Sequence, residues 1–167
     1  MTAPSARRAA VLVAGIAAGL AVLFALGWWL VGLGPAAVRP LAERATPDAL
    51  AQGRKLYDAH CAACHGKNLE GEPNWREQKP TGRMPAPPHD DSGHTWHHPD
   101  AVLFGITKEG LVPGKYAPPG YQSDMPGFGN ALKDDEIWAV LAFIANQWSE
   151  RAREHQASVT RQAGARQ

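Results

Sequence analysis

The feature that most constrains this chain is the stretch HCAACHG at residues 60–66. It holds both cysteines of the 167-residue sequence, Cys61 and Cys64, with His65 directly after them. Thiols at this spacing suit a redox pair, part of a zinc site, or two points of covalent attachment for a large group. Each alternative needs a different fold around the motif, so the rest of the sequence has to decide.

Length and charge narrow the range of functions. A chain of 167 residues, 44% hydrophobic and 20% charged, corresponds to one modest globular domain with additions at its ends. The 17 Lys and Arg residues against 16 Asp and Glu leave a formal net charge of +1. Such a balance lacks the basic field that nucleic-acid binding requires, so a nucleic-acid partner is not expected.

An uncharged run covers residues 9–34, after Arg7 and Arg8. At about 1.5 Å per residue, a helix of this length exceeds the ~30 Å hydrocarbon core of a bilayer. The run therefore predicts one transmembrane helix, with residues 1–8 in the cytoplasm because basic residues stay on that side. The remainder is expected on the periplasmic side of a bacterial inner membrane. A cleaved signal peptide stays open as an alternative, because small residues follow the run.

Three further segments follow the uncharged run. Residues 35–45 contain two prolines and no clear apolar period, which indicates a linker. Residues 46–148 carry the helical patterns and the cysteine motif, and form the expected folded domain. Residues 149–167 are expected to be a polar C-terminal tail.

Helical patterns mark both ends of the expected domain. Thr46 and Pro47 form a typical helix start ahead of the cysteines. Near the other end, apolar residues recur with helical spacing at Ile137, Val140, Leu141 and Ile144. A third, shorter helix is expected to end near Gly110. Since no stretch alternates convincingly as a strand, the fold class predicted is all-α, with long loops rich in Gly and Pro.

The long loops bear on the cysteine motif. Three small helices bury too little apolar surface for a stable domain, whereas loops packed on a porphyrin gain a core from it. C-x-x-C-H is the attachment signature of c-type haem, with two thioether bonds and the histidine on iron. A thioredoxin-like pair needs a βαβ context, which the sequence lacks. A zinc site stays open, because the chain has seven histidines.

With these residues, the chain resembles the class I monohaem cytochromes c, and more narrowly their membrane-anchored bacterial members, over about residues 46–148. The resemblance implies a small helical domain wrapped around one covalently bound haem c. In this family, a glycine and an aromatic residue ahead of the motif pack against the last helix, and here they are Gly53 and Tyr57. Their expected partners are Val140 and Phe143.

The resemblance also implies a set of cofactor-binding residues. Cys61 and Cys64 attach the haem, His65 binds its iron on the proximal side, and Met125, in the stretch SDMPGF, binds it on the distal side. Met84 or a histidine stays open as the distal ligand. Pro73 is the expected source of the carbonyl that accepts the ring N–H of His65.

Four histidines, close together in PHDDSGHTWHHPD, depart from the simplest members of the family. The stretch contains His89, His94, His97 and His98. Three alternatives stay open: a second metal site, contacts from Trp96 and a histidine to a haem propionate, or a polar loop facing water.

These features together predict a one-electron carrier rather than an enzyme, since an iron with two axial ligands has no vacant position. It would shuttle electrons between membrane or periplasmic redox proteins. The resemblance implies a quinol:cytochrome c oxidoreductase as donor and a terminal oxidase or reductase as acceptor. A haem-based gas sensor, a peroxidase-like enzyme and an accessory metal-handling protein remain the alternatives.

Overall fold

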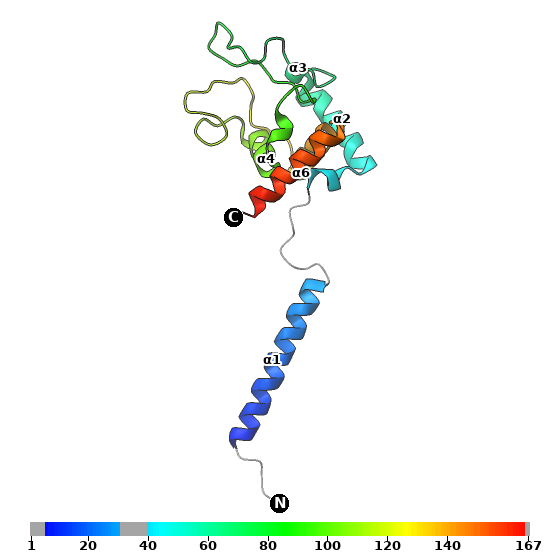
Figure 1. Ribbon diagram of the computed structural model, residues 1–167, viewed down its shortest axis with the longest axis vertical. Helices are drawn as coiled ribbons and strands as arrows, with labels where there is room; N and C mark the ends of the chain where they lie inside the picture. The colour runs from blue at the N-terminus through cyan, green and yellow to red at the C-terminus, as the bar shows by residue number, and fades with distance from the viewer. Residues whose placement is uncertain (1–5, 31–39, 166–167) are drawn as a thin grey trace, which may run out of the picture. The chain divides into compact units, whose positions relative to one another are not determined.

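The computed structural model describes residues 6–30 and 40–165 (Figure 1). The chain divides into two compact units, with the boundary between residues 39 and 40. Residues 35–39 of the predicted linker, and both ends of the chain, lie outside the described residues. Each unit is therefore described by itself.

The first unit contains one helix, α1 (Ala6–Leu30), which covers most of the uncharged run. Within the described ranges, no helix has the length and apolar character needed to cross a membrane. The predicted single-pass anchor, with the rest of the chain on the periplasmic side of an inner membrane, is therefore wrong. The prediction relied on the length of the uncharged run, but alanine and glycine make up much of the run and contribute little apolar surface.

The regular elements of the second unit are all helices. No strand occurs among residues 40–165, and the only extended pairings found there are two isolated bridges. The all-α prediction is confirmed for this part of the chain. Its elements are η1 (Leu41–Arg44), α2 (Pro47–His60), α3 (Ala62–His65), η2 (Thr95–His97), α4 (Asp100–Glu109), α5 (Asp134–Asn146) and α6 (Glu150–Gly164).

Helix α2 begins where the sequence predicts and packs mainly on α5. The Thr46 side chain accepts a hydrogen bond from the N–H of Ala49 (3.3 Å) and so caps the first turn. At Gly53 the two backbones approach so closely that a Cβ atom would lie 2.0 Å from the carbonyl oxygen of Ala139. Tyr57, fully buried, tilts against Phe143 with ring centroids 5.5 Å apart. Phe143 is thus a confirmed partner, while the backbone nearest to Gly53 is that of Ala139 rather than Val140.

Helix α5 supplies most of the core. Its residues from Ile137 to Ala145 are buried, apart from the partly exposed Trp138. Three acidic residues open the helix, and the Glu136 carboxylate accepts the N–H of Lys133 (2.8 Å). Such a helix, buried nearly all round, lies at the centre of the unit, with α2 and α4 packed on it.

The two ends of the second unit meet at a buried carboxylate, Asp100, at the start of α4. Asp100 is fully buried and accepts the N–H of Leu41 in η1 (3.0 Å). From α6 it accepts the hydroxyl of Thr160 (3.0 Å) and the side-chain amide of Gln156. Helix η1 therefore comes from the expected linker, and α6 comes from the expected polar tail. Both are bound to α4 through Asp100, so the two ends of the second unit are joined there.

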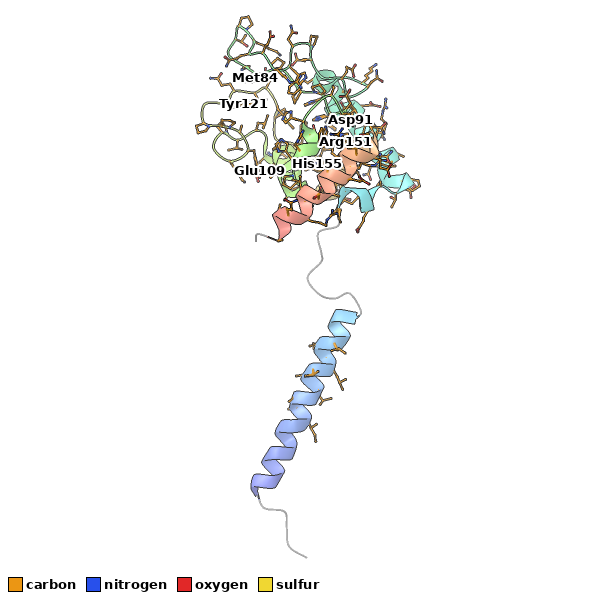
Figure 2. All side chains as sticks on the ribbon, viewed as in Figure 1. Met84, Asp91, Glu109, Tyr121, Arg151 and His155 are labelled. Carbon is orange, nitrogen blue, oxygen red and sulfur yellow. The ribbon has the colours of Figure 1, made fainter. Side chains whose placement is uncertain are left out.

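Two long segments without regular helix complete the unit: loop A, residues 66–94, and loop B, residues 110–133. They are joined to each other, since Met84 N–H donates to the carbonyl of Gln122 (2.9 Å). Arg83 donates to the carbonyl of Ser123 (2.8 Å) and pairs with Asp124 (2.9 Å). Figure 2 shows the two loops next to each other around Met84 and Tyr121.

Candidate functional site

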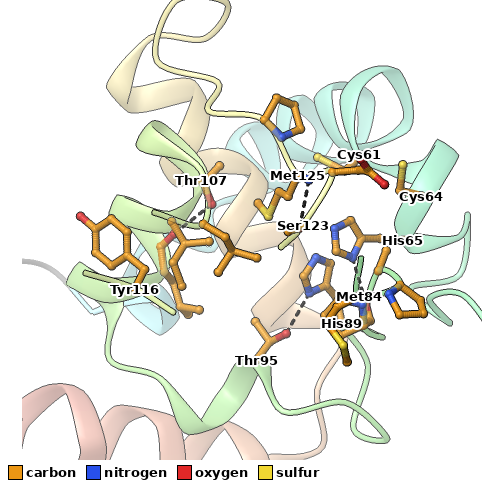
Figure 3. A pocket seen from close by; sticks show the side chains of 18 of the residues that line it. Cys61, Cys64, His65, Met84, His89, Thr95, Thr107, Tyr116, Ser123 and Met125 are labelled. Carbon is orange, nitrogen blue, oxygen red and sulfur yellow. Dashed lines mark hydrogen bonds between the residues drawn. The ribbon is translucent and has the colours of Figure 1, made fainter. Parts of the chain in front are cut away.

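A cavity of about 420 Å³ lies between the two loops and the helices (Figure 3). Its walls come from the junction of α2 with α3, from loops A and B, and from one side of α4 and α5. The helices contribute mainly apolar side chains, namely Leu103 and Ile106 of α4 with Val140, Leu141 and Ile144 of α5. The cysteine motif and both internal methionines line the same cavity.

The helical turn at Cys61 places the motif on the cavity wall. The N–H groups of Cys64 and His65 both donate to the Cys61 carbonyl, at 3.1 and 2.9 Å. Neither thiol is part of a disulfide. Burial, and secondarily the charge of Cys64, raises the pKa of the Cys61 thiol to about 11. Redox-active cysteines have lowered pKa values, so this environment argues against a catalytic dithiol.

His65 is buried, and one of its ring nitrogens is fixed. Nδ1 lies 2.8 Å from the carbonyl oxygen of Pro87. Because a carbonyl only accepts, Nδ1 carries the proton and the Nε2 lone pair is free to bind a metal. Burial lowers the pKa of His65, against the opposing effect of the Pro87 hydrogen bond. The structure thus offers a neutral imidazole, the form that ligates iron.

The predicted partner of His65, Pro73, is wrong: the carbonyl belongs to Pro87. Loop A folds back on itself, with Glu72 N–H donating to the Ala86 carbonyl (2.9 Å). This reversal carries the stretch PAPP, residues 85–88, past His65. Prolines have no N–H, so such a stretch cannot pair as a regular ladder and leaves carbonyls available to other donors. The proline-rich stretch was therefore the sequence feature from which the Pro87 carbonyl could have been predicted as the partner of His65.

Met125 and Met84 enter the cavity from different loops. Met125 follows a short turn in loop B, in which its N–H donates to the Ser123 hydroxyl (3.0 Å). Met84 lies in loop A, paired through its backbone with loop B. Figure 3 shows Met125, His65 and the cysteines around one space. Position in the cavity alone does not choose between the two methionines.

The four histidines between residues 89 and 98 do not converge on one point. Across the described part of the chain, no group of three or more His, Cys, Asp or Glu side chains is arranged to hold a metal ion. His94 stacks on Trp75 (ring centroids 5.4 Å apart) and His97 on Trp96 (3.8 Å). The second-metal alternative therefore has no support in the structure.

Two residues of this region, His89 and Trp96, bear on the cofactor. His89 stacks on His65, with ring centroids 4.0 Å apart, a contact that the sequence did not reveal. The indole N–H of Trp96 is buried and has no hydrogen-bond partner among the described residues. A buried donor without a partner is rare. Its predicted bond to a haem propionate stays a prediction.

The comparison with known families decides the identity of the fold. The sequence model of the family described as Cytochrome c matches residues 50–148, more than half of the chain. The chain belongs to the cytochrome c family. Comparison with individual curated proteins gives no match. The family binds covalently attached c-type haem, and Cys61 and Cys64 fit its C-x-x-C-H motif.

The cavity of this cytochrome c fits that cofactor. Two thiols and a neutral imidazole lie on one wall, and apolar residues of α4 and α5 form another. Haem supplies a one-electron couple at its iron, so the family assigns the chain to haem-based electron carriers.

Proposed function

We propose that the chain is a one-electron carrier of the class I monohaem type, in which His65 and Met125 bind the haem iron from opposite sides. The observation that carries the proposal is the bond from His65 Nδ1–H to the Pro87 carbonyl, at the wall of the cavity that also holds Cys61, Cys64 and Met125. This bond leaves Nε2 as the ligating nitrogen.

The choice of Met125 over Met84 rests on sequence context and on the local fold. Met125 is the methionine of the stretch SDMPGF ahead of the last helix of the family region. Its backbone is held by Ser123 and its neighbour Gly127 is packed against Glu109 at the end of α4, where a Cβ atom would lie 2.7 Å from the Glu109 carbonyl carbon. Such packing fixes the path of the loop at the position where a ligand has to be presented.

Two axial ligands make the protein a carrier rather than an enzyme or a sensor, because they leave no position for oxygen or peroxide. The proposed partners are redox proteins. As the family resemblance implies, the donor would be a quinol:cytochrome c oxidoreductase and the acceptor a terminal oxidase or reductase. A haem-based gas sensor or peroxidase-like enzyme would follow instead if the distal position were open.

The test compares Met125→Ala with Met84→Ala in the purified holoprotein. Met125→Ala is expected to abolish the far-red charge-transfer band of ferric iron bound to methionine sulfur, and to permit carbon monoxide binding to the reduced haem. Loss of a soft thioether, which favours Fe(II), is also expected to lower the reduction potential. A shift of about 59 mV changes the one-electron equilibrium tenfold. Met84→Ala is the matched control and should change none of these.

Other outcomes have definite meanings. If the two variants exchange behaviour, Met84 is the ligand and the carrier function stands. If the wild-type reduced protein already binds carbon monoxide rapidly, the distal position is open and the carrier proposal fails. The same conclusion follows if the wild-type ferric protein lacks the far-red band and its iron is high-spin.

A further inference from the structure

His89 contacts the face of the His65 ring. The two imidazoles are nearly parallel, with an angle of 21° and centroids 4.0 Å apart (Figure 3). His89 follows Pro87 by two residues, and the Pro87 carbonyl accepts from Nδ1 of His65. A single segment of loop A thus contacts the same ring at its edge and on its face.

His89 is itself held firmly in place. Its N–H donates to the Leu69 carbonyl (2.7 Å), and its own carbonyl accepts from the indole of Trp148 (2.7 Å). Its Nδ1 lies 2.8 Å from the hydroxyl of Thr95, a buried residue of η2. Backbone and ring are therefore fixed by three separate parts of the chain, at Leu69, Thr95 and Trp148.

We infer that His89 is a positioning residue, which holds the plane of the His65 imidazole through ring stacking and is itself held by Thr95. The inference rests on the proposed function, since it needs His65 as an iron ligand. A bond between iron and a ring nitrogen leaves the ring free to turn about that bond. The hydrogen bond to Pro87 limits the turn from the edge, and the flat ring of His89 limits it from the face.

Histidine suits this position better than an aliphatic residue. Its flat ring stacks in parallel on His65, and Nδ1 bonds to Thr95, so its own plane is set. A leucine fills similar space but has neither a flat face nor a hydrogen-bonding group.

The test uses the full-chain ferric holoprotein and three variants: His89→Leu, His89→Phe and Thr95→Val. The readouts are the electron paramagnetic resonance g values of the low-spin iron and the order of the haem methyl shifts in paramagnetic NMR. Both depend on the orientation of the axial imidazole and not on overall stability. His97→Leu is the matched control, because this histidine is exposed, stacks on Trp96 instead and does not line the cavity.

His89→Leu is expected to shift the g values and to rearrange the methyl pattern, while the far-red methionine band is retained. His89→Phe keeps a flat ring, so its spectra should lie closer to those of the wild type. Thr95→Val should give a smaller shift in the same direction as His89→Leu, and His97→Leu none.

Unchanged spectra in His89→Leu would overturn the inference. If that variant fails to mature, unchanged spectra in Thr95→Val would overturn it equally. Nitrogen hyperfine coupling from an axial imidazole, measured in every sample, reports His65 ligation separately. Its absence from the wild type would reject the proposed function itself, whereas its presence with invariant g values rejects only the role of His89.

Discussion

The second unit has two halves that differ in what fills them. In the helical half, α2 and α5 are packed by their own side chains, with no room for a Cβ atom between Gly53 and Ala139. In the loop half, loops A and B border a cavity of about 420 Å³. Large cavities are costly in well-packed proteins. The comparison shows that the chain completes one half of its interior alone and relies on haem for the other.

The contacts within the loops support this division. Residues 66–94 and 110–133 are held by turns, by single hydrogen bonds such as that from Met84 to Gln122, and by ion pairs at the surface. Regular helices satisfy their backbone groups without external help, but irregular segments depend on neighbours. The loop half should therefore be the first to lose structure when the cofactor is missing.

The largest effect is expected from removing the haem attachment. The double variant Cys61→Ala/Cys64→Ala should yield a chain without covalent haem that is largely unfolded, because the core of the loop half is missing. Circular dichroism should show loss of most helical signal, and hydrogen exchange should show that loops A and B are unprotected. In the wild type, haem should stay with the chain after denaturation and acid-acetone extraction. A cooperatively folded variant without haem would contradict the conclusion that the loop half relies on haem for its core.

The same division explains what could be predicted from the sequence. The starts of α2 and α5 follow from local rules: Thr46 caps one, and an acidic first turn precedes the apolar period of the other. The C-x-x-C-H motif is likewise local, so the cofactor could be predicted. The contact between His65 and Pro87 joins residues 22 apart through a loop without periodicity, and no local pattern specifies such a pairing.

Two other segments were harder to predict for different reasons. Helix α6 buries mainly Ala152 and Gln156, so its apolar face is too weak to distinguish it from a polar tail. Its position depends on a carboxylate in α4, which sequence alone does not connect to it. For α1, the length of an uncharged run was taken as evidence of a membrane-spanning helix, although the apolar surface of its side chains is small.

Gly53→Ala tests the close packing of the helical half. The new Cβ atom would lie 2.0 Å from the Ala139 carbonyl oxygen and 2.9 Å from Cβ of Phe143, so α2 and α5 have to separate. Overpacking of this kind is expected to lower the free energy of unfolding of the holoprotein by about 3 kcal/mol. Guanidinium denaturation measures it. Gly164→Ala, a helical glycine with nothing within 4 Å, is the control and should be neutral or stabilise by under ~1 kcal/mol.

If Gly53→Ala proved as harmless as Gly164→Ala, the helical half would be more plastic than its packing indicates. The far-red band of both variants should stay, because neither residue lines the cavity. Loss of the band in Gly53→Ala would show that the packing of the helical half affects the haem site, so that the two halves are not independent.

Asp100→Asn tests the junction that joins η1, α4 and α6. The Asp100 carboxylate accepts hydrogen bonds from Leu41, Gln156 and Thr160. Asn keeps one acceptor oxygen, but its NH₂ group would face a donor where the second carboxylate oxygen now accepts. Loss of charge-assisted bonds at a buried site is expected to cost about 2 kcal/mol in the free energy of unfolding. Hydrogen exchange should show that α6 opens while α2 and α5 stay protected.

The control for that experiment is Asp58→Asn, which removes an exposed pair with Arg54 on α2 (2.9 Å). Exposed pairs four residues apart on a helix contribute about 0.3–0.5 kcal/mol, so this change should be barely measurable. Equal effects of the two substitutions would mean that the buried carboxylate contributes no more than a surface one.

The smallest effect is expected at Glu72, which ties loop A together at the wall of the cavity. Its carboxylate accepts from the Lys79 ammonium (2.8 Å) and from the N–H of Ala86 (2.7 Å), and these two bonds lower the pKa of Glu72. A lowered pKa means that the stabilisation is present above the ordinary value of 4.5 and is lost as the pH falls below it. Glu72→Gln should therefore lower the urea midpoint at pH 6 slightly and flatten its decline toward pH 3, within the ~0–1 kcal/mol of exposed ion pairs.

Glu77→Gln, which changes an exposed carboxylate of the same loop, is the control and should leave the slope of the urea midpoint against pH unchanged. An identical pH dependence in wild type and Glu72→Gln would show that the haem alone holds loop A, and would make the contrast between the two halves sharper than proposed.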